Sequence, residues 1–174
     1  VLILYSELAG YVVACFNELA QRGIEVHLVK WTVNKEAPFQ FHFHPNIKVY
    51  ERDEYNADSL STLADTIQPD LIFVSGWMDK GYTAITKRLK KSIPVVTGID
   101  NQWYGTLKQK VGALLSPILI QKKFTHAFVA GDSQKAFAQK LGFGNDRIIQ
   151  GLYTADTELF ELMYEKTIQH KLEN

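Results

Sequence analysis

Short apolar runs alternate with helical patterns along most of the chain, and this alternation limits the folds open to it. Six runs resemble buried strands, at Val1–Tyr5, Ile24–Trp31, Ile47–Tyr50, Leu71–Val74, Val95–Thr97 and Ala127–Val129, with a weaker seventh at Arg147–Ile149. Between most of them, apolar residues recur at helical spacing, as Leu60, Ala64 and Ile67 do. This order predicts βαβ units, and the unbroken apolar runs predict strands covered on both faces. We therefore expect an α/β fold, a Rossmann-like three-layer α/β/α sandwich with a mostly parallel sheet.

Composition and charge argue against several classes of protein. The 174 residues suffice for one domain with a core, and 46% hydrophobic and 22% charged residues are ordinary for a globular protein. Basic and acidic residues balance at 19 each, so net charge does not favour nucleic acid as a partner. Cys15 is the sole cysteine, which excludes an internal disulfide and fits a reducing compartment. No apolar run approaches the ~20 residues of a membrane span.

Four loops are expected to lie together at the carboxyl-terminal end of the strands. In open parallel sheets, ligands bind outside the carboxyl ends of the strands. The segments that follow four predicted strands are 6–10, 75–82, 98–105 and 130–132. Two of these, SGWMDKGY and GIDNQWYG, are bounded by glycine and carry both tryptophan and aspartate. The rim formed by these loops is the predicted site.

The first of these loops argues against a dinucleotide cofactor. A dinucleotide-binding turn carries three glycines, whereas this turn reads Ser6-Glu7-Leu8-Ala9-Gly10. Glu7 would also repel a pyrophosphate at the N-terminus of the following helix. Glu7 can instead stabilise the helix dipole or face the hydroxyl groups of a ligand, and both interpretations stay open.

The loops at 75–82 and 98–105 combine aromatic rings with carboxylates and amides. The residues concerned are Trp77, Asp79, Asp100, Asn101, Gln102, Trp103 and Tyr104. Sugars need this mixture, because flat rings stack on their C–H faces while carboxylates and amides bind their hydroxyl groups. The alternative is that Trp77 and Trp103 simply cover the ends of the core.

Two further motifs have ordinary structural interpretations. His42 and His44 alternate with phenylalanines in FQFHFH, which indicates an aromatic edge strand rather than a metal pair, since no third ligand is nearby. We therefore predict no metal site. Cys15 shares a helical face with Val12 and Leu19, so we expect a buried thiol.

The segment TLKQKVGALLSPILIQKK (106–123) has an apolar middle with lysines at both ends. Its pattern predicts a core-facing helix interrupted at Pro117. The alternative is a helix that lies on a membrane surface.

Four segments, taken in chain order, form a familiar pattern. They are PDLIFV (69–74), PVVT (94–97), AFVAGDSQKAFAQKLG (127–142) and RIIQGLYTADTELF (147–160). The first two look like a "PD-hydrophobic" stretch and a "PVV" strand. The third looks like a strand, V-x-x-S and helix element, and the fourth like a closing I-x-x-G-V-D-x-x-x-F segment. In order and spacing they resemble the N-terminal domain of GT-B-fold glycosyltransferases of family 4.

The chain departs from this family pattern at three points. Its first loop holds only Gly10 where the family is usually glycine-rich. Asp100 and Asn101 stand where the family often has a histidine followed by aspartate, which puts a histidine-dependent role in doubt. The closing segment has extra residues between Gly151 and Asp156.

The resemblance implies one half of a GT-B fold. In such enzymes the N-terminal domain mainly holds the acceptor, and a C-terminal domain holds the nucleotide-sugar donor. Transfer usually retains the anomeric configuration, without a bound metal or other cofactor. We expect residues 1–154 to form the acceptor-side domain and residues 155–174 a helical linker toward a donor-binding domain. The acceptor would be a glycan or lipid-linked, and the protein cytoplasmic, in peripheral contact with the inner membrane face. Alone, this fragment would be inactive.

On this interpretation the rim residues take specific roles. Asp100 is the expected catalytic residue, which orients the acceptor hydroxyl or accepts its proton. The expected substrate-binding residues are Glu7, Gly10, Trp77, Asp79, Asn101, Gln102 and Trp103. Two alternatives stay open. One is a sugar-nucleotide epimerase with a GT-B fold, and the other is a non-catalytic sugar-binding subunit that pairs with a separate donor-binding chain.

Overall fold

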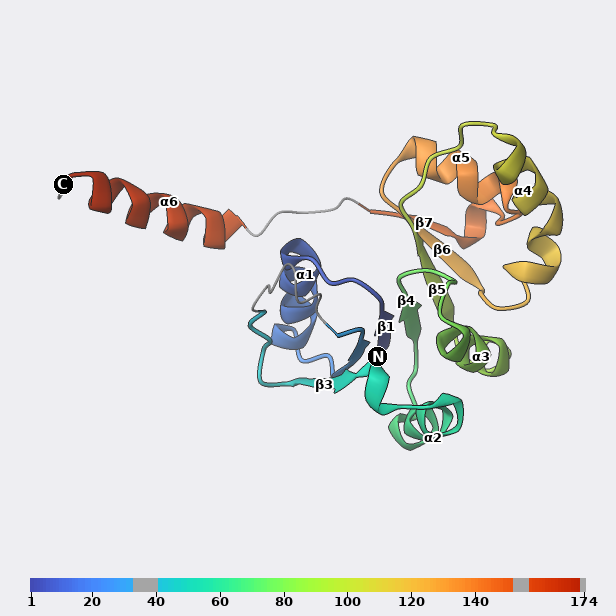
Figure 1. The fold of residues 1–174 in the computed structure, drawn as a ribbon, viewed down its shortest axis with the longest axis horizontal. Helices are drawn as coiled ribbons and strands as arrows, with labels where there is room; N and C mark the ends of the chain where they lie inside the picture. The colour runs from blue at the N-terminus through green and yellow to red at the C-terminus, as the bar shows by residue number, and fades with distance from the viewer. Residues whose placement is uncertain (33–40, 152–156, 173–174) are drawn as a thin grey trace.

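The computed structural model of the chain describes residues 1–32, 41–151 and 157–172. Its centre is a seven-stranded sheet with the strand order β3-β2-β1-β4-β5-β6-β7 (Figure 1). The strands are β1 (Leu2–Tyr5), β2 (Val26–Lys30), β3 (Ile47–Glu51), β4 (Ile72–Val74), β5 (Val95–Ile99), β6 (His126–Val129) and β7 (Ile148–Gln150). Every neighbouring pair is parallel. The predicted parallel sheet is therefore confirmed, and the weak run at 147–149 supplies its edge strand β7.

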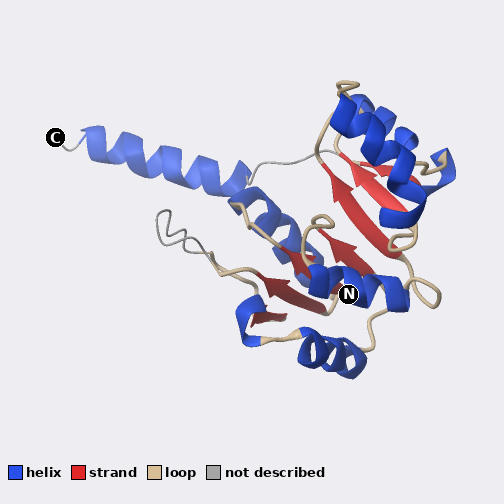
Figure 2. Ribbon diagram, turned by 45° about the vertical axis from the view of Figure 1, so that its right-hand side comes forward, coloured by secondary structure: helices blue, strands red, loops and turns tan. Residues whose placement is uncertain are grey.

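Helices cover both faces of this sheet. The helices are α1 (Gly10–Gln21), α2 (Ala57–Ile67), α3 (Lys80–Leu89), α4 (Leu107–Leu119), α5 (Asp132–Lys140) and α6 (Thr157–Leu172), with 3-10 turns η1 (Arg52–Glu54) and η2 (Asn145–Arg147). Helix α1 lies on one face, whereas α2, α3, α4 and α5 lie on the other (Figures 1 and 2). This confirms the Rossmann-like three-layer arrangement. Among the described residues, no helix has the length and apolar character needed to cross a bilayer.

A separate apolar core fills the space on each side of the sheet. The core beneath α1 contains Ile3, Val12, Phe16, Ala20, Val26, Leu28 and Ile47. The larger core on the opposite side includes Leu2, Leu4, Leu60, Val74, Ile85, Val129 and Phe137. Successive residues of a strand point to opposite faces, so both faces of the central strands are buried. This explains why the strand runs are continuously apolar instead of alternating with polar residues.

Two local expectations from the sequence are wrong. Residues 41–44 are irregular rather than an edge strand, because Asn17 of α1 occupies their backbone groups. Its Nδ2 donates to the His42 carbonyl oxygen at 2.9 Å, and its Oδ1 accepts from the His44 amide at 2.8 Å. The start of the FQFHFH motif lies outside the described residues. Cys15 is exposed, because it falls outside the buried face of α1.

The segment 106–123 also departs from expectation. It forms α4, and Pro117 lies inside the helix without ending it. Leu107, Leu114 and Ile118 are exposed, whereas Ser116 is fully buried. The Ser116 hydroxyl donates to the carbonyl oxygen of Leu141 at 2.6 Å. This bond holds the small-residue side of the helix against the protein, so the large apolar side faces solvent.

Tyr82 attaches α3 to the carboxyl ends of two strands. Its side chain is 1% exposed. Its hydroxyl is the donor for the carbonyl oxygens of Val29 and Tyr5, which lie 3.1 and 3.3 Å from Oη. Burial raises the pKa of Tyr82, so the hydroxyl stays protonated and remains a donor.

Tyr82→Phe removes this hydroxyl and keeps the ring. We expect the free energy of unfolding to fall by about 1–1.5 kcal/mol, because the hydrogen bonds of the hydroxyl are lost while the Tyr5 carbonyl oxygen keeps the Trp31 amide as a donor. Urea denaturation measures this change. The matched control is Tyr104→Phe at a side chain that is 71% exposed, where a change within about 0.5 kcal/mol is expected. Equal effects of the two substitutions would contradict the role given to Tyr82.

Candidate functional site

The carboxyl ends of β1 and β4 form the centre of the candidate site. The chain leaves β1 through α1 on one face of the sheet and leaves β4 through α3 on the other. At such a reversal of strand order the loops part and leave a crevice that binds ligands. Because all the strands are parallel, the loops at 6–10, 75–82, 98–105 and 130–132 lie together at the carboxyl-terminal end of the strands, as predicted from the sequence.

The hydroxyl groups of Ser6 and Ser75 are in contact at the start of the loops that follow β1 and β4. The Ser6 amide donates to Ser75 Oγ at 3.0 Å, and the two Oγ atoms are 3.2 Å apart. A Cβ atom added at Gly10 or Gly76 would meet no heavy atom within 4 Å, so there is open space at both glycines. Glu7 is exposed next to Ser6. Sequence reasoning missed both serines, although each lies directly after a predicted strand.

Asp100 lies directly after β5, next to β4 in the sheet. Its carboxylate is exposed, and Oδ1 accepts from Asn101 Nδ2 at 3.0 Å. Gln134 of α5 donates to the Asp100 carbonyl oxygen at 3.2 Å. The backbone is therefore held from α5, while the side chain faces solvent at the rim.

The rest of this loop is held by α4. Gln109 Nε2 donates to the Gln102 carbonyl oxygen at 2.7 Å, and Gln109 Oε1 accepts from the Tyr104 amide at 2.8 Å. Both contacts use the backbone of the loop. The half-buried Gln102 is thus tied to the first turn of α4 through its carbonyl group.

The two tryptophans of these loops pack against the protein and are only partly exposed. Trp77 and Trp103 are partly buried against the larger core, and the Trp103 ring lies 5.8 Å from the Phe137 ring centroid. The side chains that stand out from the same loops are Met78 and Tyr104, at 82% and 71% exposed. This arrangement favours the alternative in which both tryptophans cover the end of the core.

Asp79 is enclosed by hydrogen-bond donors, and only 8% of its side chain is exposed. Its Oδ1 caps α3 by accepting from the Tyr82 amide at 3.0 Å. Arg52 donates to both carboxylate oxygens at 2.9 and 3.2 Å, and Trp31 Nε1 donates to Oδ2 at 3.1 Å. Burial acts to raise the pKa of Asp79, but these bonds outweigh it and the pKa is lowered. Asp79 is therefore a scaffold residue beneath the rim, which its sequence context did not indicate.

Gly81 leaves room for the Arg52 guanidinium beside Asp79. A Cβ atom at Gly81 would lie 2.5 Å from Arg52 Nη2. The guanidinium also lies 5.6 Å from the Tyr82 ring centroid and donates to the Tyr55 carbonyl oxygen at 2.6 Å. Arg52 thus joins η1, which follows β3, to the start of α3.

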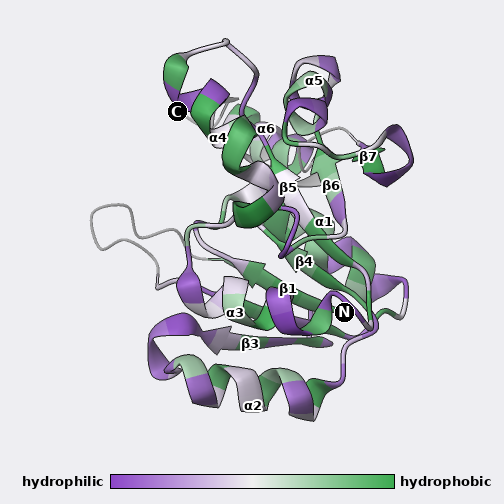
Figure 3. Cartoon of the chain, turned by 90° about the vertical axis from the view of Figure 1, so that its right-hand side faces the viewer, coloured by the Kyte–Doolittle hydropathy of each residue, from purple (hydrophilic) through white to green (hydrophobic). Residues whose placement is uncertain are grey.

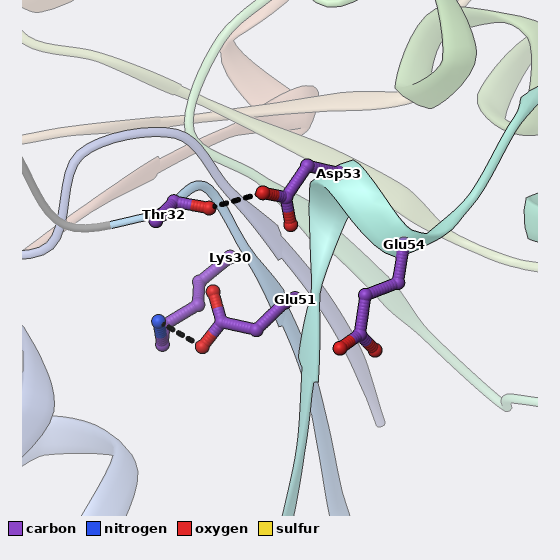
Figure 4. Close-up of a pocket in the computed structure, with 5 residues that line it drawn as sticks. All are labelled: Lys30, Thr32, Glu51, Asp53 and Glu54. Atoms are coloured by element: carbon purple, nitrogen blue, oxygen red, sulfur yellow. Dashed lines mark hydrogen bonds and ion pairs between the residues drawn. The ribbon is translucent and has the colours of Figure 1, made fainter.

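A hollow of ≈ 480 Å³ lies on the same rim, at the ends of β2 and β3 (Figure 4). It is lined by Lys30, Thr32, Glu51, Asp53 and Glu54. Lys30 is buried and pairs with Glu51 Oε1, and Thr32 Oγ1 donates to Asp53 Oδ2 at 2.8 Å. Glu51 Oε2 is buried and accepts no hydrogen bond from the described residues. Sequence reasoning missed this hollow, because Lys30 belongs to a run assigned to the core.

No metal-binding cluster occurs in the part of the chain that the structure describes. Within residues 1–32, 41–151 and 157–172, no three or more His, Cys, Asp or Glu side chains are grouped so that they could hold a metal ion.

Comparisons with known proteins agree with this architecture. The family model described as Glycosyltransferase Family 4 matches residues 9–148. Crystal structures of HepE from Anabaena, in complex with UDP and with UDP and glucose, superpose with TM-scores of 0.54 and 0.50 at 9% and 11% identity. They cover 97% and 96% of the chain, which spans 50% of the length of HepE in both cases. At this identity the likeness concerns the fold. None of the curated proteins compared by sequence matches the chain.

Asp79→Asn tests the scaffold role of this carboxylate. The substitution keeps the size of the side chain but removes the charge that faces Arg52. We expect the free energy of unfolding to fall by about 1.5–3 kcal/mol, the usual contribution of hydrogen bonds to charged groups. The measurement is urea denaturation at neutral pH, with Asp70→Asn at an exposed position as the matched control.

The ion pair between Asp79 and Arg52 predicts that the stability of the fold depends on pH. The folded pKa of Asp79 lies below the ordinary value of 3.8, so its stabilising contribution is present above that value. It is lost as the pH falls from there through the folded pKa. The stability difference between the parent chain and Asp79→Asn should therefore shrink as the solution is acidified below about pH 4. A difference that stays constant over this range would show that the charge of Asp79 is not what stabilises the fold.

Proposed function

Since the chain belongs to Glycosyltransferase Family 4, we propose that it supplies the acceptor-binding half of a glycosyltransferase. In this proposal a sugar moves from a nucleotide-sugar donor to a hydroxyl group of a glycan or lipid-linked acceptor, with retention of configuration. The observation that carries the proposal is the contact between Ser6 and Ser75 at the carboxyl ends of β1 and β4, with Asp100 exposed on the adjacent loop after β5.

The acceptor is proposed to bind along this edge of the sheet. The hydroxyl groups of Ser6 and Ser75 can each donate and accept, and the Glu7 carboxylate can accept from a sugar hydroxyl. Gly10 and Gly76 leave room for the ligand beside them. This set of short polar side chains suits a polyhydroxyl ligand that enters close to the backbone.

Asp100 is proposed to act on the reacting hydroxyl group. Its Oδ1 accepts from Asn101, which leaves Oδ2 to accept a hydrogen bond, or a proton, from the acceptor hydroxyl. Either step makes the acceptor oxygen a better nucleophile toward the anomeric carbon of the donor. Asn101 serves in this proposal as the residue that orients the carboxylate.

The donor is proposed to sit mainly in a second domain that faces the same rim. The Glu7 carboxylate lies just before α1, where its charge would repel a diphosphate. The chain spans 50% of HepE, and the matched HepE structures contain UDP. Closure of the two halves over the rim would exclude water, which limits hydrolysis of the donor.

Binding of donors to the 174-residue chain tests this division of roles. We expect calorimetry with UDP-, GDP- and ADP-sugars to give affinities weaker than about 1 mM, close to −4 kcal/mol. An affinity near 1 μM, about −8 kcal/mol, would place the donor site in this chain and contradict the proposal.

Asp100→Asn in the complete enzyme tests the proposed catalytic group. Turnover should fall by about 10²–10⁴ if Asp100 accepts a proton, or by roughly 10–10² if it only accepts a hydrogen bond. The melting temperature should not change, because the carboxylate is exposed. The matched control is Asp146→Asn. Asp146 is an exposed aspartate of η2, just before the amino-terminal end of β7 and so at the other end of the strands from the rim. Turnover within a factor of about two of the parent would remove Asp100 from the chemistry.

A further inference from the structure

Helix α4 turns its small side chains toward the protein and its large apolar side chains toward solvent. Gly112 and Ala113 are half-buried, and Ser116 is completely buried with its hydroxyl bonded to the Leu141 carbonyl oxygen. The outward side carries the α4 stripe, which consists of the exposed residues Leu107, Val111, Leu114, Leu115 and Ile118. The hydrophobic residues of α4 are visible in Figure 3. A surface helix normally has the opposite arrangement, with its apolar face toward the core.

Lysines lie on both sides of this stripe. At about 100° per residue, Leu107, Leu114 and Ile118 share one line along the helix. Lys108 and Lys110 then fall on opposite flanks of that line, and both are exposed. Residues 106–123 contain four lysines and no aspartate or glutamate, although positive and negative charges balance over the whole chain. The stripe thus has a positive border, formed by Lys108 and Lys110 on its flanks and by Lys122 and Lys123 beyond the C-terminal end of α4.

We propose that the α4 stripe docks on the surface of a bilayer that contains anionic lipids. An interfacial helix buries its apolar side at the boundary between headgroups and acyl chains, and its flanking lysines extend to the phosphates. The positive border complements anionic headgroups, whereas two copies of this face would bring like-charged lysines together. One helix side of five large apolar residues, with cations on both flanks, suits a flat surface of negative charge.

This orientation places the rim beside the bilayer. α4 begins immediately after the loop that carries Asp100, and Gln109 in its first turn holds that loop. Tyr104, which is 71% exposed, lies three residues before Leu107 in the loop that leads into α4. Under the proposed function, which this consequence requires, the acceptor is one whose reactive hydroxyl lies close to a membrane surface. Docking itself does not depend on transfer activity.

Co-sedimentation of the 174-residue chain with lipid vesicles tests the proposal. We expect binding to vesicles of phosphatidylcholine mixed with phosphatidylglycerol, and much weaker binding to phosphatidylcholine alone. Raising the salt from about 0.1 M to about 1 M shortens the screening length from about 10 Å to about 3 Å, and should release most of the bound protein.

Two pairs of variants separate the α4 stripe from other surfaces. The combined change of Leu107→Gln, Leu114→Gln and Ile118→Gln should reduce vesicle affinity on the order of tenfold or more. Its matched control alters the exposed apolar residues of α6, as Phe160→Gln, Met163→Gln and Tyr164→Gln, and should retain binding. Lys108→Gln with Lys110→Gln should likewise reduce affinity roughly tenfold or more. Lys87→Gln with Lys91→Gln, an equal loss of exposed charge, should have little effect.

Circular dichroism and melting curves should match the parent in every variant, because all the altered side chains are exposed. Undiminished vesicle binding of the α4 variants would overturn the proposal, as would loss of binding in the α6 variant alone. Absence of binding to the anionic vesicles would also overturn it. Self-association that the α4 changes abolish, without any vesicle binding, would assign the stripe to contact between copies of the chain instead.

Discussion

A parallel connection between strands must cross one face of the sheet, and it does so with right-handed chirality. The order β3-β2-β1-β4-β5-β6-β7 therefore sends α1 to one face and α3 to the other, and the loops after β1 and β4 part. Ser6 and Ser75 meet at that point, and the loop of Asp100 lies on the same edge. The position of the candidate site follows from the handedness of the crossovers, not from any single motif.

The rim holds two aspartates that look equivalent in sequence, yet their environments differ. Asp79 and Asp100 both follow a strand within a glycine-bounded loop. Arg52, Trp31 and the Tyr82 amide surround the first, so its charge stabilises the connection between η1 and α3. The second is exposed, and its side chain accepts a hydrogen bond from Asn101. A buried, paired carboxylate supports the scaffold, whereas an exposed one on the rim is available to a ligand.

Helix α4 shows that the periodicity of a helix does not reveal which side packs inward. Its apolar side chains predict a core-facing surface, but the side that faces the protein carries Ser116, which is fully buried where α4 meets the C-terminal end of α5. The hydrogen bond from Ser116 to the Leu141 carbonyl oxygen satisfies a polar group at the end of α5. The leucines are then left outside, and this surface leads directly to the loop that carries Asp100.

The sequence by itself determined the strands and most helices, the parallel sheet, the shared rim and the resemblance to family 4. These properties depend on local periodicity, on loop composition and on the order of segments along one chain. The tertiary structure alone decided strand order, the partners of polar side chains and the outward face of α4. Each of these depends on residues far apart in the chain, since 69 positions separate Ser6 from Ser75 and 27 separate Arg52 from Asp79. A local sequence pattern does not show which distant donor binds a carboxylate. The burial and the charge pairing of that carboxylate depend on this donor, so only the tertiary structure decides them.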